Sequence, residues 1–129
     1  MLVIMKRPGK VATLGELTDF RSMREYVCGQ IDFVSFCTSD GSPYLIVFND
    51  NFLNDGSEFN ISFCGAQYFG NIFICKCGIV NGDADFIGLD PSDIFNIADN
   101  LCWSRDDKIS LIVLGVEASR GNLGGEKDV

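Results

Sequence analysis

The sequence predicts a single small α+β domain, a mostly antiparallel sheet of about five to seven strands with two helices packed on it. Three observations support this fold class: several apolar runs have the length of strands, turn residues separate them, and two segments repeat apolar residues with the period of a helix. With 129 residues, 47% of them hydrophobic, the chain is long enough to bury one core without a metal or disulfide. We expect the domain to cover residues 1–117 and residues 118–129 to form a disordered tail.

The most informative stretch lies late in the chain and contains a strand, a turn and a capped helix. Residues 72–77 are apolar apart from one lysine, as expected of a strand buried in a sheet. A turn at residues 81–83 ends this strand, because Asn and Gly tolerate positive φ angles. Asp90 offers an N-cap carboxylate, and Pro91 suits the first helical position. A helix therefore starts here, and we expect Asp93 on its polar side.

The N-terminal part of the chain predicts a hairpin followed by the first helix. Residues 2–7 and 11–14 read as strands on either side of a Pro-Gly turn. Thr18 is the expected N-cap of the helix, and Gly29 the signal that ends it. The turn carries a small group of basic side chains.

The middle of the chain predicts a second hairpin, a loop and a short strand. Residues 31–37 and 44–48 are strand-like and flank a turn rich in Ser, Gly and Pro. Residues 49–56 are polar, and we expect a surface loop, where recognition residues often lie. Residues 61–64 predict a short strand.

An apolar run at residues 109–116 predicts a further strand because it is rich in Ile, Val and Leu. Such a run must be covered, since an exposed apolar strand promotes aggregation. The sequence leaves open whether it completes the sheet within one chain or across a dimer.

The chain offers few of the residues that catalysis or metal binding requires. It contains no His, which removes Ser-His and Cys-His catalysis and the commonest metal ligand. Cys75 and Cys77 lack the spacing of a zinc knuckle, and further donors would have to come from Cys28 and Cys64. Residues 83–88 begin like a calcium loop but lack its later ligands. We expect no metal, no cofactor and no enzymatic activity, with the six cysteines reduced.

The charge balance is acidic, with ten Lys and Arg against eighteen Asp and Glu and a formal net charge of −8. We therefore expect no direct binding to nucleic acid, because phosphate contacts need a basic surface. No apolar run approaches the roughly 18 to 20 residues of a membrane span, so we expect no membrane association and a cytoplasmic location. Nine acids and a single base, Lys76, lie between residues 40 and 99, which predicts one strongly negative face.

Several short motifs recur in an order that resembles a phage- and plasmid-borne family of small proteins known as domain of unknown function 3846. These motifs are KRPGK at residues 6–10, MREYV at 23–27 with GQI at 29–31, VFND at 47–50, GNIFI at 70–74 and GDADFIGL at 82–89. The resemblance spans roughly residues 1–101. Two features depart from it, the GDADF segment, where the family usually has a plainer one, and the apolar run beyond Trp103. The resemblance implies a mobile genetic element as context and no catalytic residues.

On this basis we expect a non-enzymatic phage or mobile-element protein that binds and inhibits a host protein, a component of antiviral defence. A row of carboxylates can present to a basic channel the charge of a phosphate backbone, so nucleic-acid mimicry of a nucleic-acid-binding component is one mechanism. The residues expected to bind this partner are the acids of the polar loop and of the second helix start: Asp50, Asp55, Asp83, Asp85, Asp90 and Asp93.

Two alternatives remain open. The first is a small-molecule binding module that sequesters a nucleotide second messenger of a defence system at an oligomer interface. It would use basic residues and a helix start for phosphate and aromatic rings for the base: Lys6, Arg7, Lys10, Thr18, Phe48, Phe52 and Tyr68. The second is a structural or regulatory interaction domain. A homo-oligomer is compatible with all three hypotheses.

Overall fold

The computed structural model describes residues 1–52, 56–63 and 65–121. Within them, six antiparallel strands form one sheet in the order β2-β1-β7-β4-β3, with β8 paired to β7. Their bounds are Leu2–Lys6 (β1), Thr13–Glu16 (β2), Ile31–Cys37 (β3), Pro43–Asn49 (β4), Ile72–Val80 (β7) and Asp83–Ile87 (β8). A small second sheet pairs β5 (Phe59–Phe63) with β6 (Ala66–Phe69). The predicted α+β class is confirmed.

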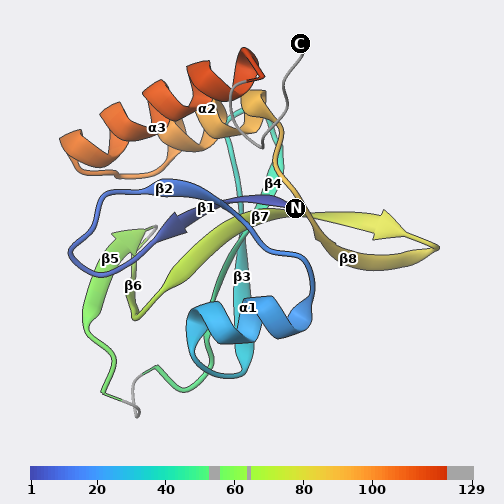
Figure 1. The fold of residues 1–129 in the computed structure, drawn as a ribbon, viewed down its shortest axis with the longest axis vertical. Coiled ribbons are helices and arrows are strands. Elements are labelled where there is room, and N and C mark those ends of the chain that lie inside the picture. Colours follow the sequence, from blue (N-terminus) through green and yellow to red (C-terminus); the bar gives the residue numbers. More distant parts are fainter. Residues whose placement is uncertain (53–55, 64, 122–129) are drawn as a thin grey trace.

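Three helices cover the two faces of the main sheet: α1 (Phe20–Val27), α2 (Pro91–Asn100) and α3 (Arg105–Ser119). Figure 1 shows α2 and α3 side by side on one side of the sheet and α1 on the other. Alternate residues of β7 therefore enter two cores. Ile74 packs in the core beneath α2 and α3, and Phe73 packs in the core beneath α1.

The prediction of a strand at residues 109–116 is wrong, because these residues form most of α3. The side chain of Ser104 caps the helix by accepting from Asp107 N at 3.1 Å, and two acids in the first turn suit the helix dipole. Leu111 is fully buried, and Gly115 lies so close to the Phe95 ring of α2 that an added Cβ would sit 2.9 Å from its Cζ. Capping and packing against α2 thus outweigh the strand propensity of the run.

Both predicted helices are present, and one cap differs. The helix α2 begins at Pro91 with Asp90 as N-cap residue, as predicted. The helix α1 is capped by Asp19 and not by Thr18, since the Asp19 carboxylate accepts from Ser22 N at 2.9 Å. The Ser22 hydroxyl in turn accepts from Asp19 N, which completes a capping box.

Two strands were not anticipated, β6 and β8. The strand β8 follows directly from the turn predicted at residues 81–83, where Asn81 and Gly82 both have positive φ angles of 53° and 86°. Such a turn matches the twist of a tight hairpin, so the chain reverses and pairs again with β7. At the other end, α3 continues past residue 117 to Ser119. The remainder of the predicted tail, residues 122–129, lies outside the described residues.

Candidate functional site

The hairpin of β7 and β8 extends beyond the rest of the sheet. Residues 72–75 of β7 pair with β1 and β4, whereas residues 76–80 pair with β8. Figure 1 shows this part of the hairpin projecting from the body of the molecule. We refer to residues 76–87 as the β7–β8 arm. It presents two strand faces and a turn to the surroundings.

The two faces of the arm differ in polarity. Asp83 and Asp85 are exposed and alternate with Ala84 and Phe86 along β8, so the register places the acids and the apolar residues on opposite faces of the arm, while Asp85 also borders the groove beside α1. Asp85 Oδ1 accepts from Phe86 N at 2.7 Å, and neither acid takes part in an ion pair of the described residues. Ile79 pairs with Ala84 and is 73% exposed.

An apolar groove of about 240 Å³ adjoins the apolar face of the arm. The Phe86 ring contacts Phe20 and Phe33 edge to face, at centroid distances of 5.9 and 5.6 Å. Phe20 and Phe33 remain about half exposed, at 50% and 49%, although α1 and β3 hold them. Leu45, Cys77, Ala84 and Asp85 complete the lining. The described chain therefore leaves three aromatic rings open to a partner.

Asp93, a predicted binding residue, is instead an internal ion-pair partner. Its Oδ2 lies 2.8 Å from Lys76 Nζ and accepts from Asp90 N at 2.7 Å, while its Oδ1 accepts from the Tyr44 hydroxyl at 2.6 Å. Burial alone would raise the pKa of Asp93, but the hydrogen bonds from Lys76 and Tyr44 outweigh it and leave this pKa below its ordinary value. The same hydrogen bond has the opposite effect on the lysine and raises the pKa of Lys76.

The remaining predicted acids do not gather on one face. Asp90 is exposed, with Oδ2 3.4 Å from Lys76 Nζ at the base of the arm. Asp50 follows β4 at the end of the sheet opposite the arm, where its N–H donates to Gln30 O. Asp55 lies outside the described residues. Asp83, Asp85 and Asp90 are thus the exposed acids that the structure places along the arm and its base.

The predicted basic group at residues 6–10 splits into three different environments. Lys6 is 6% exposed, and its Nζ donates to Lys10 O at 2.6 Å and to Arg7 O at 3.2 Å. The Arg7 guanidinium lies over the Tyr26 ring, 4.9 Å from its centroid. Lys10 is exposed beside the turn. Burial raises the pKa of Tyr26 to about 12, even though the nearby Arg7 charge lowers it.

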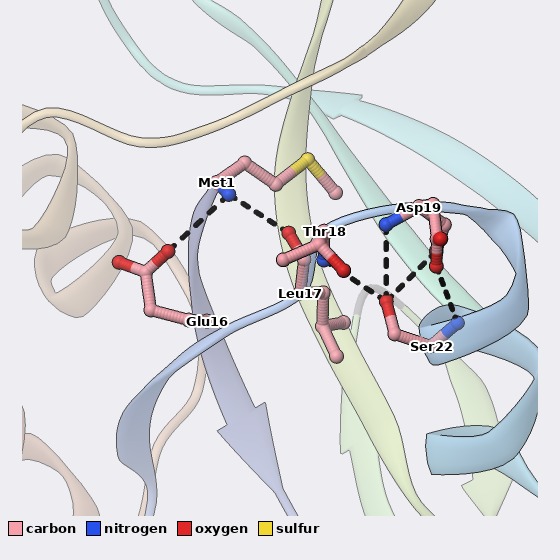
Figure 2. Close-up of polar contacts among 6 residues, drawn as sticks. All are labelled: Met1, Glu16, Leu17, Thr18, Asp19 and Ser22. Carbon is pink, nitrogen blue, oxygen red and sulfur yellow. Dashed lines mark hydrogen bonds and ion pairs between the residues drawn. The ribbon is translucent and has the colours of Figure 1, made fainter.

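Thr18 does not join these bases. Figure 2 shows Thr18 and Asp19 gathered around the Ser22 hydroxyl, near the terminal amine of Met1. That amine donates to Leu17 O at 2.8 Å and lies at the start of β1, whereas Lys6 ends that strand. The Asp19 carboxylate already occupies the helix start and would repel a phosphate. The structure therefore contradicts an anion site that combines Thr18 with residues 6–10.

The rings expected to stack a base are mostly internal. Phe48 and Tyr68 are 7% and 4% exposed and pack on each other at a centroid distance of 5.4 Å. Phe52 is partly buried and stacks on Phe69 at 5.6 Å. Phe48 and Tyr68 belong to the core, and a base could stack on them only if the surrounding core side chains were displaced.

The cysteines do not form a metal centre within the described residues, where no group of three candidate ligands lies close together. Burial raises the pKa of the Cys75 thiol to about 12, which opposes the thiolate form that binds metals. Cys77 faces the apolar groove. Cys64, one of the two further donors that a zinc site would need, lies outside the described residues.

The aromatic residues of the groove were missed by sequence reasoning, although a signal was present. The order Asp83, Ala84, Asp85, Phe86 alternates polar and apolar residues, the pattern of a strand with two different faces. Phe20 is an apolar residue of the first helix, and nothing local in the sequence indicated that α1 would leave it half exposed.

The fold and this site define a small α+β domain with a projecting hairpin and an open apolar groove. The chain belongs to the family described as a domain of unknown function (DUF3846), whose model matches residues 1–101. The match ends at the residue that follows α2, so α3 lies beyond it. No curated protein and no solved structure matches the chain. None of the helices in residues 1–52, 56–63 and 65–121 is long and apolar enough to cross a membrane.

Proposed function

We propose that the chain is a non-enzymatic protein-binding domain that inhibits a host protein through the β7–β8 arm. The observation that carries this proposal is the exposure of Ile79, at 73%, beside three phenylalanine rings that line an open groove. Large apolar side chains that remain exposed together commonly mark an interaction surface. Asp83 and Asp85 on the other face of the arm give the same region a negative charge.

The arrangement suits a partner surface with an apolar anchor beside Lys or Arg side chains. Interfaces obtain most of their affinity from a few apolar or aromatic residues buried in pockets, with a polar rim around them. The groove between Phe20, Phe33 and Phe86 can receive such an anchor. The acidic face of the arm, together with a formal net charge of −8, would speed the approach of a basic partner.

The mobile-element context that the family resemblance implies makes a host defence protein the proposed target. Mimicry of nucleic acid would then involve the short acidic strip of the arm and its base, formed by Asp83, Asp85 and Asp90. Asp50, at the opposite end of the sheet, would not take part. A target with a basic nucleic-acid groove would pair its cations with this strip.

Charge reversal with a matched control tests the proposal. The arm variant carries Asp83→Lys and Asp85→Lys, and the control carries Glu25→Lys and Asp50→Lys, which change the net charge equally at exposed positions away from the arm. Each chain is immobilised, host lysate is passed over it, and the retained proteins are quantified by mass spectrometry. The Kd of the most enriched protein is then measured with purified components.

We expect the arm variant to weaken this Kd by about tenfold or more and the control by less than about threefold. A third variant, Ile79→Asp, should weaken it as well, because it places a charge on the apolar face. Equal losses in the arm variant and the control would show a nonspecific charge effect. That result, or unchanged binding of the arm variants, would overturn the proposal.

A further inference from the structure

A second groove lies at the opposite end of β7 from the arm. It has a volume of about 620 Å³ and runs between the β1–β2 turn, the strand β5 and the start of α3. This volume falls within the range of small-molecule sites. The groove shares no lining residue with the arm groove. Two buried polar groups on its wall lack the partners that they need.

The first of these groups is the Lys6 ammonium. It is 6% exposed, and its Nζ donates to two backbone carbonyls, at Arg7 and Lys10. An ammonium has three N–H donors, so one remains for a ligand. None of the ion pairs of the described residues includes Lys6. Because a buried charge without a counter-ion is costly, this position favours an anion.

The second group is the Asn60 side chain, which is 9% exposed. Its Nδ2 donates to Lys6 O at 2.8 Å and to Gly70 O at 2.7 Å. Its Oδ1 is buried and has no hydrogen-bond partner among the described residues. The two carbonyl acceptors fix the orientation of this amide, since the reverse orientation would place Oδ1 against both carbonyls. Asn60 lines the groove, and its buried Oδ1 is an acceptor that lacks a donor among the described residues.

The rest of the lining adds a ring and a second cation. Phe59 is 50% exposed and is held edge to face on Phe69 at a centroid distance of 5.6 Å, which leaves ring surface free. Lys10 is exposed on the same wall as Lys6. On the opposite wall, Asp107 is already occupied because it accepts from Ala12 N and the Ser104 hydroxyl, each at 2.8 Å. Asp106 is exposed and can accept from ligand hydroxyls.

We propose that this groove binds a mononucleotide. The phosphate lies by Lys6 and Lys10, a hydroxyl or amino group of the nucleotide donates to Asn60 Oδ1, and the base stacks on Phe59. The sugar hydroxyls face Asp106, because a carboxylate repels the phosphate and accepts from hydroxyls. The nucleotide site predicted from the sequence included Thr18 and the core rings Phe48 and Tyr68. The groove proposed here does not include them, and Asn60 and Phe59 take their place.

The experiment is a titration of the full chain with adenosine monophosphate (AMP), followed by two-dimensional amide NMR. Adenosine and ribose 5-phosphate serve as partial ligands. The variants are Lys6→Met, Lys10→Met and Phe59→Leu, and the control is Lys108→Met, an exposed lysine of α3 that does not line the groove. Lys10→Met and Phe59→Leu change exposed side chains, so they keep the test valid if Lys6→Met impairs folding.

We expect AMP to shift the Asn60 side-chain amide and the signals of residues 59–62, and to bind more tightly than either partial ligand. Lys6→Met, Lys10→Met and Phe59→Leu should each weaken the Kd by about fivefold or more, with Lys108→Met unchanged. Shifts located elsewhere, equal effects in the control, or AMP binding no tighter than ribose 5-phosphate would overturn the proposal. Because no arm residue lines this groove, these outcomes are independent of the protein-binding proposal.

Discussion

Two lysines at opposite ends of the sheet have contrasting environments. Lys76, at the base of the arm, lies 2.8 Å from the Asp93 carboxylate and 3.4 Å from that of Asp90. Lys6 is more deeply buried, and within the described part of the chain its Nζ donates to two backbone carbonyls and to no carboxylate. Both residues sit on strands whose other members are mostly apolar. Among the described residues, the charge of Lys76 is therefore compensated by carboxylates and that of Lys6 is not.

The difference separates a structural site from a candidate binding site. The carboxylate of Asp93 is shared by Lys76, Tyr44 and the backbone of Asp90, so one side chain joins β7, β4 and the start of α2. Such a network stabilises one arrangement of strands and helix because each polar group is satisfied. Around Lys6 and Asn60, the described residues leave one N–H of Lys6 Nζ and Asn60 Oδ1 without a hydrogen-bond partner. A bound ligand would supply those partners.

The largest effect in this comparison is expected from Asp93→Ala. The change removes the acceptor of both Lys76 and Tyr44 and leaves a largely buried ammonium without its main partner. We expect the free energy of unfolding to fall by about 3 kcal/mol. Urea unfolding, followed by the fluorescence of the single tryptophan, Trp103, measures this loss.

The matched control is Asp99→Ala in the same helix. Asp99 is exposed and lies 3.8 Å from Lys108, a geometry that stabilises little, so we expect a change within about 0.5 kcal/mol. Similar losses in the two variants would contradict the structural role assigned to Asp93.

A smaller effect is expected from pH. The pKa of Asp93 lies below its unfolded value of about 3.9, so the ion pair stabilises the fold above that pH, and this stabilisation is lost as the pH falls through the folded pKa. The pKa of Lys76 is raised above its unfolded value of about 10.4, so its contribution is present below that value and is lost as the pH rises through the folded pKa.

Asp93→Asn removes the acidic part of this dependence. We expect the wild type to exceed the variant in unfolding free energy at neutral pH and the difference to shrink as the pH falls below about 4. Urea unfolding of both proteins over a series of pH values gives the difference directly. A difference that stays constant down to about pH 2 would show that the ionisation of Asp93 is not its source.

The sequence predicted the features of the fold that depend on local chemistry. Asp90 and Pro91 marked the start of α2 correctly because capping and a proline at the first position act within one turn. The strand predicted at residues 109–116 was wrong because it rested on the strand propensity of Ile and Val. The Ser104 cap and the close contact of Gly115 with Phe95 stabilise a helix there instead. That contact joins two helices, and no local pattern encodes it.

The candidate sites were harder to predict, since they depend on burial. Asp93 looked like one solvated acid among several, although Lys76 as the only charge of its strand could have indicated a buried carboxylate partner. Lys6 looked like part of an exposed basic turn. Its burial follows from the carbonyls of residues 7 and 10 folding back over Nζ, and the role of Asn60 follows from long-range hydrogen bonds to residues 6 and 70.

The smallest effect on the ligand-free protein is expected from Lys6→Met, which gives the most direct contrast with Lys76. Methionine keeps most of the apolar stem and removes a buried charge that has no counter-ion in the part of the chain that the structure describes, so the unfolding free energy should change by less than about 1 kcal/mol or rise slightly. Lys76→Met should cost more, because it leaves the Asp93 carboxylate without its cation. With AMP in excess, the wild type and Lys76→Met gain stability through ligand binding, and Lys6→Met gains less, by about 1 kcal/mol for a fivefold weaker Kd. Thermal unfolding of the three proteins with and without AMP measures both parts, and a Lys6→Met protein that AMP still stabilises fully would show that the Lys6 charge is not what the ligand satisfies.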